Sequence, residues 1–292
     1  MAETFSFESA DGTVLRGWRN NAAGRPLVIA NGLGTIPEAW PALVGPDSGY
    51  RSATWYHRGT FGSQRPTDPA RIRVADHVSD LLALMDAERL ERALVASWSV
   101  GVNVAFEFAR RHPDRVAGIL AVAGVPGGTF ATMGGPLRIP RFLRHPIATR
   151  VAKLGRVAGP ALTWLAPKVP VTPATAWAIA HSGFMLPAAK PGIVAPMLKQ
   201  FLQQDWRWYA TLAVAAAEHA PMDLSFVTCP VTLVAGRHDV LTSMHDMLEA
   251  ARRIPHAHVT VLSGSHFLPL EYPELVHDAL DELARRSDTL TN

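Results

Sequence analysis

The stretch from Leu94 to Ala105 constrains the fold of this 292-residue chain more than any other. It begins with β-favouring apolar residues, passes through Ser97, Ser99 and Gly101, and continues as a helix-like segment to Arg111. A strand that turns abruptly into a helix leaves room only for small side chains around the turn. The pattern predicts that Ser99 has a strained backbone, with its hydroxyl exposed at the helix N-terminus.

This turn makes Ser99 a candidate nucleophile. It also directs the backbone N–H of Val100 toward any oxyanion that forms beside the serine. The alternative interpretation is an ordinary serine in a strand-to-helix turn. Because Ser97 stands where such a motif usually carries glycine, the motif by itself leaves both interpretations open.

Short apolar runs alternate with amphipathic segments along most of the chain. Residues 74–90, for example, carry apolar side chains mainly at helical spacing, with polar ones opposite. The alternation predicts an α/β protein with a mainly parallel, doubly wound central sheet flanked by helices. The expected strands lie at 5–7 and 14–18, which form an opening hairpin, and at 27–30, 53–56, 94–98, 116–123, 231–235 and 258–262.

Between the sixth and seventh expected strands the composition changes. Residues 115–204 contain no Asp or Glu but many Lys and Arg, and they are rich in Pro, Ala, Met and Trp. The segment reads as several short helices broken by prolines. We therefore expect a helical cap (lid) at 126–220, inserted after the sixth strand into a core domain made of 1–125 and 221–292. A mobile apolar cap can exclude water from an active site and shape it.

Composition limits the remaining possibilities. A net charge of +3 is small for this length and predicts no nucleic-acid partner. The single cysteine, Cys229, rules out an internal disulfide framework and is most simply a small core residue. The first eleven residues lack the features of a signal peptide, and no apolar run is long enough to span a membrane. A soluble cytoplasmic protein is therefore expected.

Two further polar residues follow expected strands, namely Asp239 and His266. Parallel strands bring their carboxyl ends to one edge of a sheet, so these residues are expected to meet Ser99 there. A serine needs a base to become nucleophilic, and the base needs a carboxylate to orient it. Taken singly, Asp239 could cap the helix near Ser243, and His266 could be an incidental loop residue. Their joint occurrence in this order favours a catalytic triad.

With these motifs in place, nearly the whole chain resembles the α/β-hydrolase superfamily. The family's Gly-x-Ser-x-Gly elbow is similar to Ser97–Gly101, and its His-Gly-x-Gly oxyanion loop is similar to Asn31–Gly34. Its Arg-Gly-x-Gly-x-Ser loop is similar to Arg58–Ser63, which has one additional residue. Its acid and base loops are similar to Gly236–Asp239 and Gly264–His266.

The resemblance implies a role for each matched residue. Ser99 would be the nucleophile, His266 the base and Asp239 the acid, and the N–H groups of Leu33 and Val100 would form the oxyanion hole. We also expect four residues around these motifs to contact the substrate. They are Asn31, Gly32, Trp98 and Phe267. No cofactor and no metal ion are expected.

A serine at the elbow, in place of aspartate, argues against the haloalkane dehalogenases and epoxide hydrolases of this fold, which use a carboxylate nucleophile. Acyl transfer remains. The sequence predicts a serine esterase or lipase-like hydrolase that cleaves carboxylic esters of hydrophobic acyl or alkyl groups. Thioester, lactone or carbon–carbon bond hydrolysis and cofactor-free perhydrolysis are alternatives on the same triad. A non-catalytic hydrolase-like binding protein is an alternative of another class.

The basic, carboxylate-free cap allows three interpretations. It is either a solvated basic face, or a surface attracted to an anionic membrane, or a docking site for an acidic partner such as an acyl carrier protein or a CoA ester. The expected substrate is a small hydrophobic ester.

Overall fold

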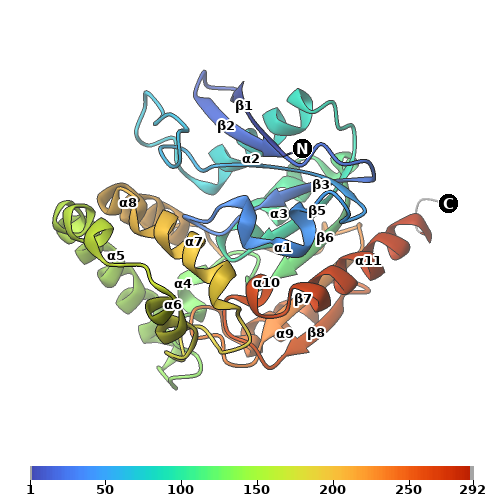
Figure 1. Ribbon diagram of the computed structural model, residues 1–292. Helices are drawn as coiled ribbons and strands as arrows, with labels where there is room; N and C mark the ends of the chain where they lie inside the picture. The colour runs from blue at the N-terminus through green and yellow to red at the C-terminus, as the bar shows by residue number, and fades with distance from the viewer. Residues whose placement is uncertain (1, 290–292) are drawn as a thin grey trace.

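The computed structural model describes residues 2–289, which form an eight-stranded sheet with helices on both faces (Figure 1). The strand order is β1-β2-β4-β3-β5-β6-β7-β8. The first hairpin pairs antiparallel, as does β2 with β4, and every other neighbouring pair is parallel. The mainly parallel sheet predicted from sequence is confirmed. The strands are β1 (Glu3–Glu8), β2 (Val14–Arg19), β3 (Arg25–Ala30), β4 (Tyr50–Trp55), β5 (Ala93–Trp98), β6 (Val116–Val122), β7 (Val231–Gly236) and β8 (His258–Leu262).

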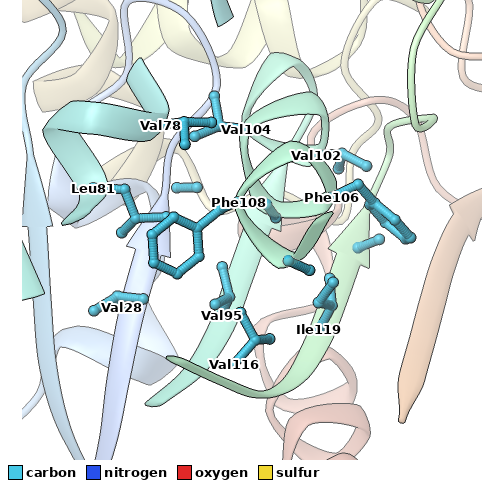
Figure 2. Packing of buried hydrophobic residues seen from close by; sticks show 14 of the residues in the cluster. Val28, Val78, Leu81, Val95, Val102, Val104, Phe106, Phe108, Val116 and Ile119 are labelled. Atoms are coloured by element: carbon cyan, nitrogen blue, oxygen red, sulfur yellow. The ribbon is translucent and has the colours of Figure 1, made fainter. Parts of the chain in front are cut away.

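One face of the sheet is covered by α2 (Val74–Ala87), α3 (Val100–Arg111) and α9 (Met244–Ala251). Figure 2 shows Phe106 and Phe108 of α3 packed over Val28, Val95 and Ile119 of the central strands. All five side chains are fully buried. At about 25 cal/mol per Å² of apolar surface removed from water, such side chains each stabilise the fold by roughly 1.5–3 kcal/mol.

The opposite face is covered by α1 (Pro41–Val44), α10 (Leu268–Glu271) and α11 (Pro273–Thr289). Leu27 and Leu94 are the strand neighbours of Val28 and Val95, and they point to this second layer because successive strand side chains alternate between faces. Strands buried on both faces explain why the sequence shows continuous apolar runs instead of strict alternation.

Between β6 and β7 the described chain is helical. It contains α4 (Thr129–Thr132), α5 (Arg141–Leu165), α6 (Pro173–Ala180), α7 (Pro191–Leu202) and α8 (Trp206–Ala217). In Figure 1 these helices lie on the side of the sheet away from α11. Three short 3-10 turns complete the described secondary structure, at Pro37–Ala39, Pro113–Arg115 and Ala166–Lys168.

The expectation that prolines break this whole segment into short helices is wrong for α5. This helix runs for 25 residues and contains Pro146 and Pro160 inside it. A proline leaves the carbonyl four residues earlier without its helical donor. Those carbonyls belong to Phe142 and Arg156, both exposed, so water can satisfy them without ending the helix.

Three parallel strands deliver the predicted site to one sheet edge. β5 ends directly before Ser99, β7 ends three residues before Asp239, and β8 ends four residues before His266. Within residues 2–289 we find no helix that is both long and apolar enough to span a membrane.

Candidate active site

Ser99 lies at the junction of β5 and α3 with φ 56° and ψ −122°, a strained conformation for a residue other than glycine. A Cβ atom placed on Gly101 would lie 1.9 Å from the carbonyl oxygen of Ala30, so only glycine fits there. Ser97 occupies the other small-residue position. Its buried hydroxyl donates to the carbonyl of Leu120 on β6, which explains why serine is accommodated in place of glycine.

The three residues predicted to meet do so. His266 Nε2 lies 2.9 Å from Ser99 Oγ, and His266 Nδ1 lies 2.9 Å from Asp239 Oδ2. The carboxylate can only accept, so Nδ1 carries the proton and Nε2 is left to accept from the hydroxyl. Asp239 is fully buried, and its second oxygen accepts from the N–H groups of Leu241 and Thr242. The alternative that Asp239 caps the helix near Ser243 is not supported, because both N–H groups belong to the loop before α9, whose N-cap residue is Ser243.

The loop after β3 passes close to Ser99. A Cβ on Gly32 would lie 3.4 Å from the Ser99 Cβ. Gly32, Leu33 and Val100 all line the same cavity as Ser99. Val100 is the first residue of α3, where helical N–H groups have no partner within their own helix. Leu33 and Val100 thus lie beside Ser99 at the cavity, and their role as the oxyanion hole stays a prediction.

Of the four expected substrate contacts, Gly32, Trp98 and Phe267 line this cavity and Asn31 does not. The Asn31 amide donates to Thr54 Oγ1 and accepts from Trp40 Nε1, and the residue is 2% exposed. These two hydrogen bonds hold the loop after β3 in place. The expected contact between Asn31 and substrate is not seen in the cavity lining, because a position in a loop does not by itself determine which way the side chain points.

Trp98 also contacts the loop that carries His266. Its indole Nε1–H donates to the backbone carbonyl of His266 over 2.8 Å, and its ring packs edge-on against Trp40 and Phe267. A tryptophan directly before the serine therefore also fixes the loop that carries the imidazole.

A cavity of about 690 Å³ extends from Ser99 into the helices between β6 and β7. No Lys, Arg, Asp or Glu is among the described residues that line it. Burial raises the pKa of the lining residue Tyr209 to about 12, so its phenol stays protonated. The lining residues from the inserted helices include Phe130, Met133, Val151, Leu162, Ile179, Val194, Met197, Leu198, Phe201 and Trp206.

Two hydrogen-bonding residues at this edge escaped sequence reasoning. Gln204, just before α8, donates from Nε2 to the carbonyl of Gly34 in the loop after β3 over 3.1 Å. Glu271 accepts from both the N–H and the hydroxyl of Ser265, next to His266, and from the N–H of Leu186 near α6. Neither residue belongs to a local pattern, so only the folded structure reveals these contacts.

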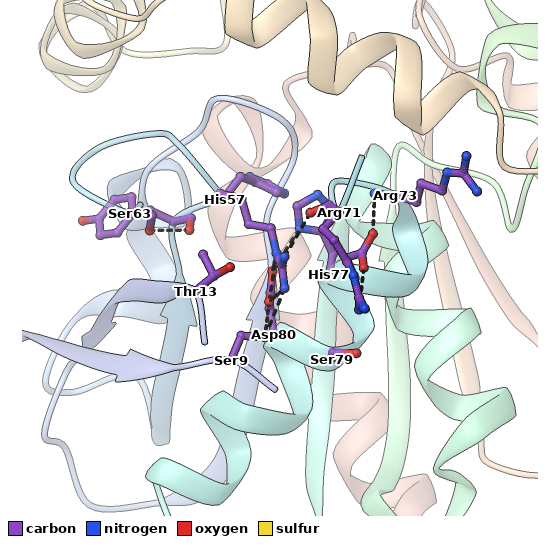
Figure 3. A network of polar contacts seen from close by, with 12 residues as sticks. Ser9, Thr13, His57, Ser63, Arg71, Arg73, His77, Ser79 and Asp80 are labelled. Atoms are coloured by element: carbon purple, nitrogen blue, oxygen red, sulfur yellow. Dashed lines mark hydrogen bonds and ion pairs between the residues drawn. The ribbon is translucent and has the colours of Figure 1, made fainter. Parts of the chain in front are cut away.

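The loop after β4 is anchored by a buried ion pair (Figure 3). Arg58 contacts both oxygens of Asp80, on α2, at 2.9 and 2.7 Å, and the Ser9 hydroxyl also donates to Asp80. Burial by itself raises the pKa of Asp80, but His77 and Arg58 outweigh it and hold the pKa below its usual value. The carbonyl of Arg58 accepts from Trp208 Nε1 of α8, which ties this loop to the inserted helices.

Titratable groups are not arranged here as a metal site. Within residues 2–289 no cluster of three or more His, Cys, Asp or Glu side chains is placed to hold a metal ion.

The chain is similar in sequence and in fold to several known hydrolases. The chain is 25% identical over 273 residues to 3-oxoadipate enol-lactonase 2 of Acinetobacter baylyi, covering 90% of each chain. It is 32% identical over 121 residues to epoxide hydrolase B of Mycobacterium tuberculosis, but there it spans only a third of that protein's length, 33%. The fold resembles a thermophilic esterase from Thermogutta terrifontis with a TM-score of 0.74 at 21% identity, covering 98% and 99% of the two chains.

A family model described as the alpha/beta hydrolase fold matches residues 25–273, which is well over half of the sequence. Together with the sheet order and the positions of the three strand-end loops, this match shows that the chain belongs to the alpha/beta hydrolase family.

Proposed function

We propose that this hydrolase cleaves carboxylic esters of hydrophobic acyl or alkyl groups through Ser99, His266 and Asp239. The observation that carries the proposal is the pair of 2.9 Å contacts that His266 makes with the serine hydroxyl and the buried carboxylate. A serine, a base and an orienting acid in this relation are what acyl transfer requires.

In the proposed reaction Ser99 Oγ attacks the ester carbonyl carbon while His266 Nε2 takes the hydroxyl proton. The negative charge that develops on the carbonyl oxygen faces the N–H groups of Leu33 and Val100. The imidazolium, steadied by Asp239, gives its proton to the departing alkoxide, and an acyl-enzyme ester remains. Water then gives a proton to His266 and attacks the acyl carbon. The bond from that carbon to Ser99 Oγ breaks, His266 returns the proton to Oγ, and the carboxylic acid is released.

The cavity supports hydrophobic, uncharged substrates. Its walls carry no charged side chain apart from His266 when protonated, within the part of the chain that the structure describes. An ester with a free carboxylate would have to place that charge against apolar walls, which is costly. We assign the cavity walls to a cap at residues 126–220, over a core formed by 1–125 and 221–292.

Lactones and thioesters undergo the same acyl-transfer steps, and the relative named as an enol-lactonase makes lactone hydrolysis the alternative to test first. Carbon–carbon bond hydrolysis and perhydrolysis remain further alternatives on this triad. Epoxide hydrolysis is disfavoured because Ser99 stands at the nucleophile position where a carboxylate would be needed.

The test is labelling of the purified chain with a fluorophosphonate, which forms a phosphorus–oxygen bond to an activated serine and releases fluoride. We expect one adduct, at Ser99, by intact mass and peptide mapping. The Ser99→Ala variant should not label, and its turnover of nitrophenyl esters should fall on the order of 10⁴- to 10⁶-fold.

The matched control is Ser97→Ala, which removes a serine hydroxyl two residues away that faces β6 and not the cavity. It should label and turn over esters. Turnover should rise with acyl chain length as the cavity fills. Absence of labelling and of turnover across esters, thioesters and lactones would instead favour a non-catalytic binding protein.

A further inference from the structure

Helix α5 has an unusual distribution of exposed apolar side chains. It lies at the edge of the molecule in Figure 1, far from α11, and Gly159 is its only fully buried residue. Phe142 is 77% exposed, Val157 80% and Trp164 66%. Monomeric proteins rarely expose large apolar side chains in such a continuous series unless the surface binds something. The series consists of Phe142, Leu143, Ile147, Val151, Leu154, Val157, Leu162, Trp164 and Leu165.

Cations share this exposed side. Arg150, Lys153 and Arg156 follow at intervals of three residues, and all are exposed. Among the described residues no ion pair involves any of them, whereas Arg141 and Arg144, at the start of α5, pair with Asp246 of α9. The three cations therefore contribute a positive field at the surface that no ion pair among the described residues neutralises.

The whole chain is polarised in the same sense. Residues 115–204 hold ten Lys or Arg and no Asp or Glu, which leaves 18 Lys or Arg against 25 Asp or Glu elsewhere. The segment between β6 and β7 is thus positive, and the rest of the chain is negative. Near an anionic surface such a molecule is turned so that α5 faces the surface.

We propose that the exposed face of α5 docks on an anionic lipid bilayer, with its cations at the headgroups and its apolar side chains inserted among the acyl chains. A helix lying in the interface combines these features: apolar and aromatic side chains with Lys and Arg beside them. The inference goes beyond the proposed reaction and does not depend on it.

Other occupants fit this face less well. A second copy of the chain would place the same unpaired cations opposite each other without a carboxylate between them. An acidic protein would complement the charge, but it would have to match apolar side chains spread along a convex 25-residue helix. A bilayer accepts such side chains at any spacing.

Docking would bring the cavity next to the lipid. Val151 is 62% exposed and Leu162 38% exposed, yet both also line the cavity that reaches Ser99. Helix α5 therefore forms the wall between the cavity and the proposed lipid surface.

The test is flotation of the full chain with vesicles, in the Ser99→Ala background so that no hydrolysis alters the lipids. Vesicles of phosphatidylcholine alone are compared with vesicles containing about one third phosphatidylglycerol. We expect binding to the anionic vesicles only, and we expect it to weaken as salt rises from about 0.05 to 0.5 M.

Replacing the three cations (Arg150→Gln, Lys153→Gln, Arg156→Gln) should lower the partition coefficient on the order of 100-fold, because each cation near such a surface contributes about fivefold. Leu154→Ser with Val157→Ser should lower it by at least about tenfold. The matched control replaces three exposed cations outside the cap (Arg89→Gln, Arg252→Gln, Arg285→Gln) and should bind like the parent.

All substituted side chains are exposed, so unfolding midpoints should stay the same and loss of binding cannot be ascribed to misfolding. The proposal is overturned if the parent does not float with anionic vesicles, or if the control loses as much binding as the cap variant. It is also overturned if the parent is a dimer in solution that Leu154→Ser with Val157→Ser disperses, since α5 would then be an interface between copies.

Discussion

Replacing Gly101 by alanine tests the strand-to-helix turn directly. A Cβ at this position would lie 1.9 Å from the carbonyl oxygen of Ala30 and 2.6 Å from its carbonyl carbon. Cβ atoms in proteins essentially never approach other heavy atoms closer than 3.0 Å, so the two backbones must separate by about 1 Å. Ala30 pairs with Ser97 across β3 and β5, and the separation therefore strains the centre of the sheet.

Overpacking of a rigid core costs about 1–3 kcal/mol, and backbone-on-backbone contact puts Gly101→Ala at or above the upper end, about 3 kcal/mol. The same shift moves Ser99, two residues away. A displacement of about 1 Å in a reacting group lowers rates roughly 100-fold. We therefore expect both a lower urea midpoint and about 100-fold slower fluorophosphonate labelling of Ser99.

The matched control is Gly192→Ala. Gly192 is also the second residue of a helix, α7, but a Cβ there has no heavy atom within 4 Å. Alanine should leave stability unchanged or raise it by about 0.5 kcal/mol, since glycine is a poor helix former. Urea unfolding followed by circular dichroism compares the two variants. Equal midpoints and equal labelling rates would refute the argument that the close approach of α3 to β3 positions the serine.

Three further predictions concern one hydrogen bond and two buried titratable side chains. Gln204→Met removes the hydrogen bond to the Gly34 carbonyl and should slow labelling of Ser99 up to about tenfold. The buried carbonyl is left without its donor, so the free energy of unfolding in urea should also fall by about 1–3 kcal/mol. Burial lowers the pKa of His57 from 6.5 to about 3, so between these values the unfolded chain binds a proton that the folded chain does not. The free energy of unfolding should fall with decreasing pH in that window, and His57→Phe should remove up to about 1.4 kcal/mol per pH unit of this fall in urea titrations at successive pH values. Burial also raises the pKa of the Cys229 thiol to about 11, so a disulfide reagent at pH 8 should modify it at least about tenfold more slowly in the native protein than in urea. A native thiol as reactive as the unfolded one would contradict that burial.

The parts of the fold that sequence predicts well are those set by local pattern. Continuous apolar runs identify strands buried on both faces, and polar residues just beyond them identify the sheet edge. Ser99, Asp239 and His266 were predicted to meet because parallel strands end together, and their atoms lie within hydrogen-bonding distance. No side-chain detail was needed for that step.

The parts that sequence does not predict depend on contacts between distant residues. Pro146 and Pro160 suggested breaks in a helix that continues, because sequence does not show that the affected carbonyls face solvent. The position of Asn31 at the start of the predicted oxyanion loop suggests a contact with substrate, but Thr54 and Trp40 occupy its amide. Asn31 follows β3, Thr54 lies on β4 and Trp40 precedes α1, so only the fold brings the three side chains together.

Gly34 and Gly59 show a further pair of contacts between residues distant in the sequence. Both have φ +73°, and a Cβ on either would collide with a side chain from the inserted segment, 2.6 Å from Gln204 Nε2 and 2.2 Å from Trp208 Nε1. Glycine in these loops therefore serves the approach of the inserted helices as much as that of a substrate. Each of the two side chains donates to a loop carbonyl at the sheet edge. The loops after β3 and β4 are therefore each hydrogen-bonded to residues 204–208, and a change in the position of that segment is expected to move the loop beside Ser99.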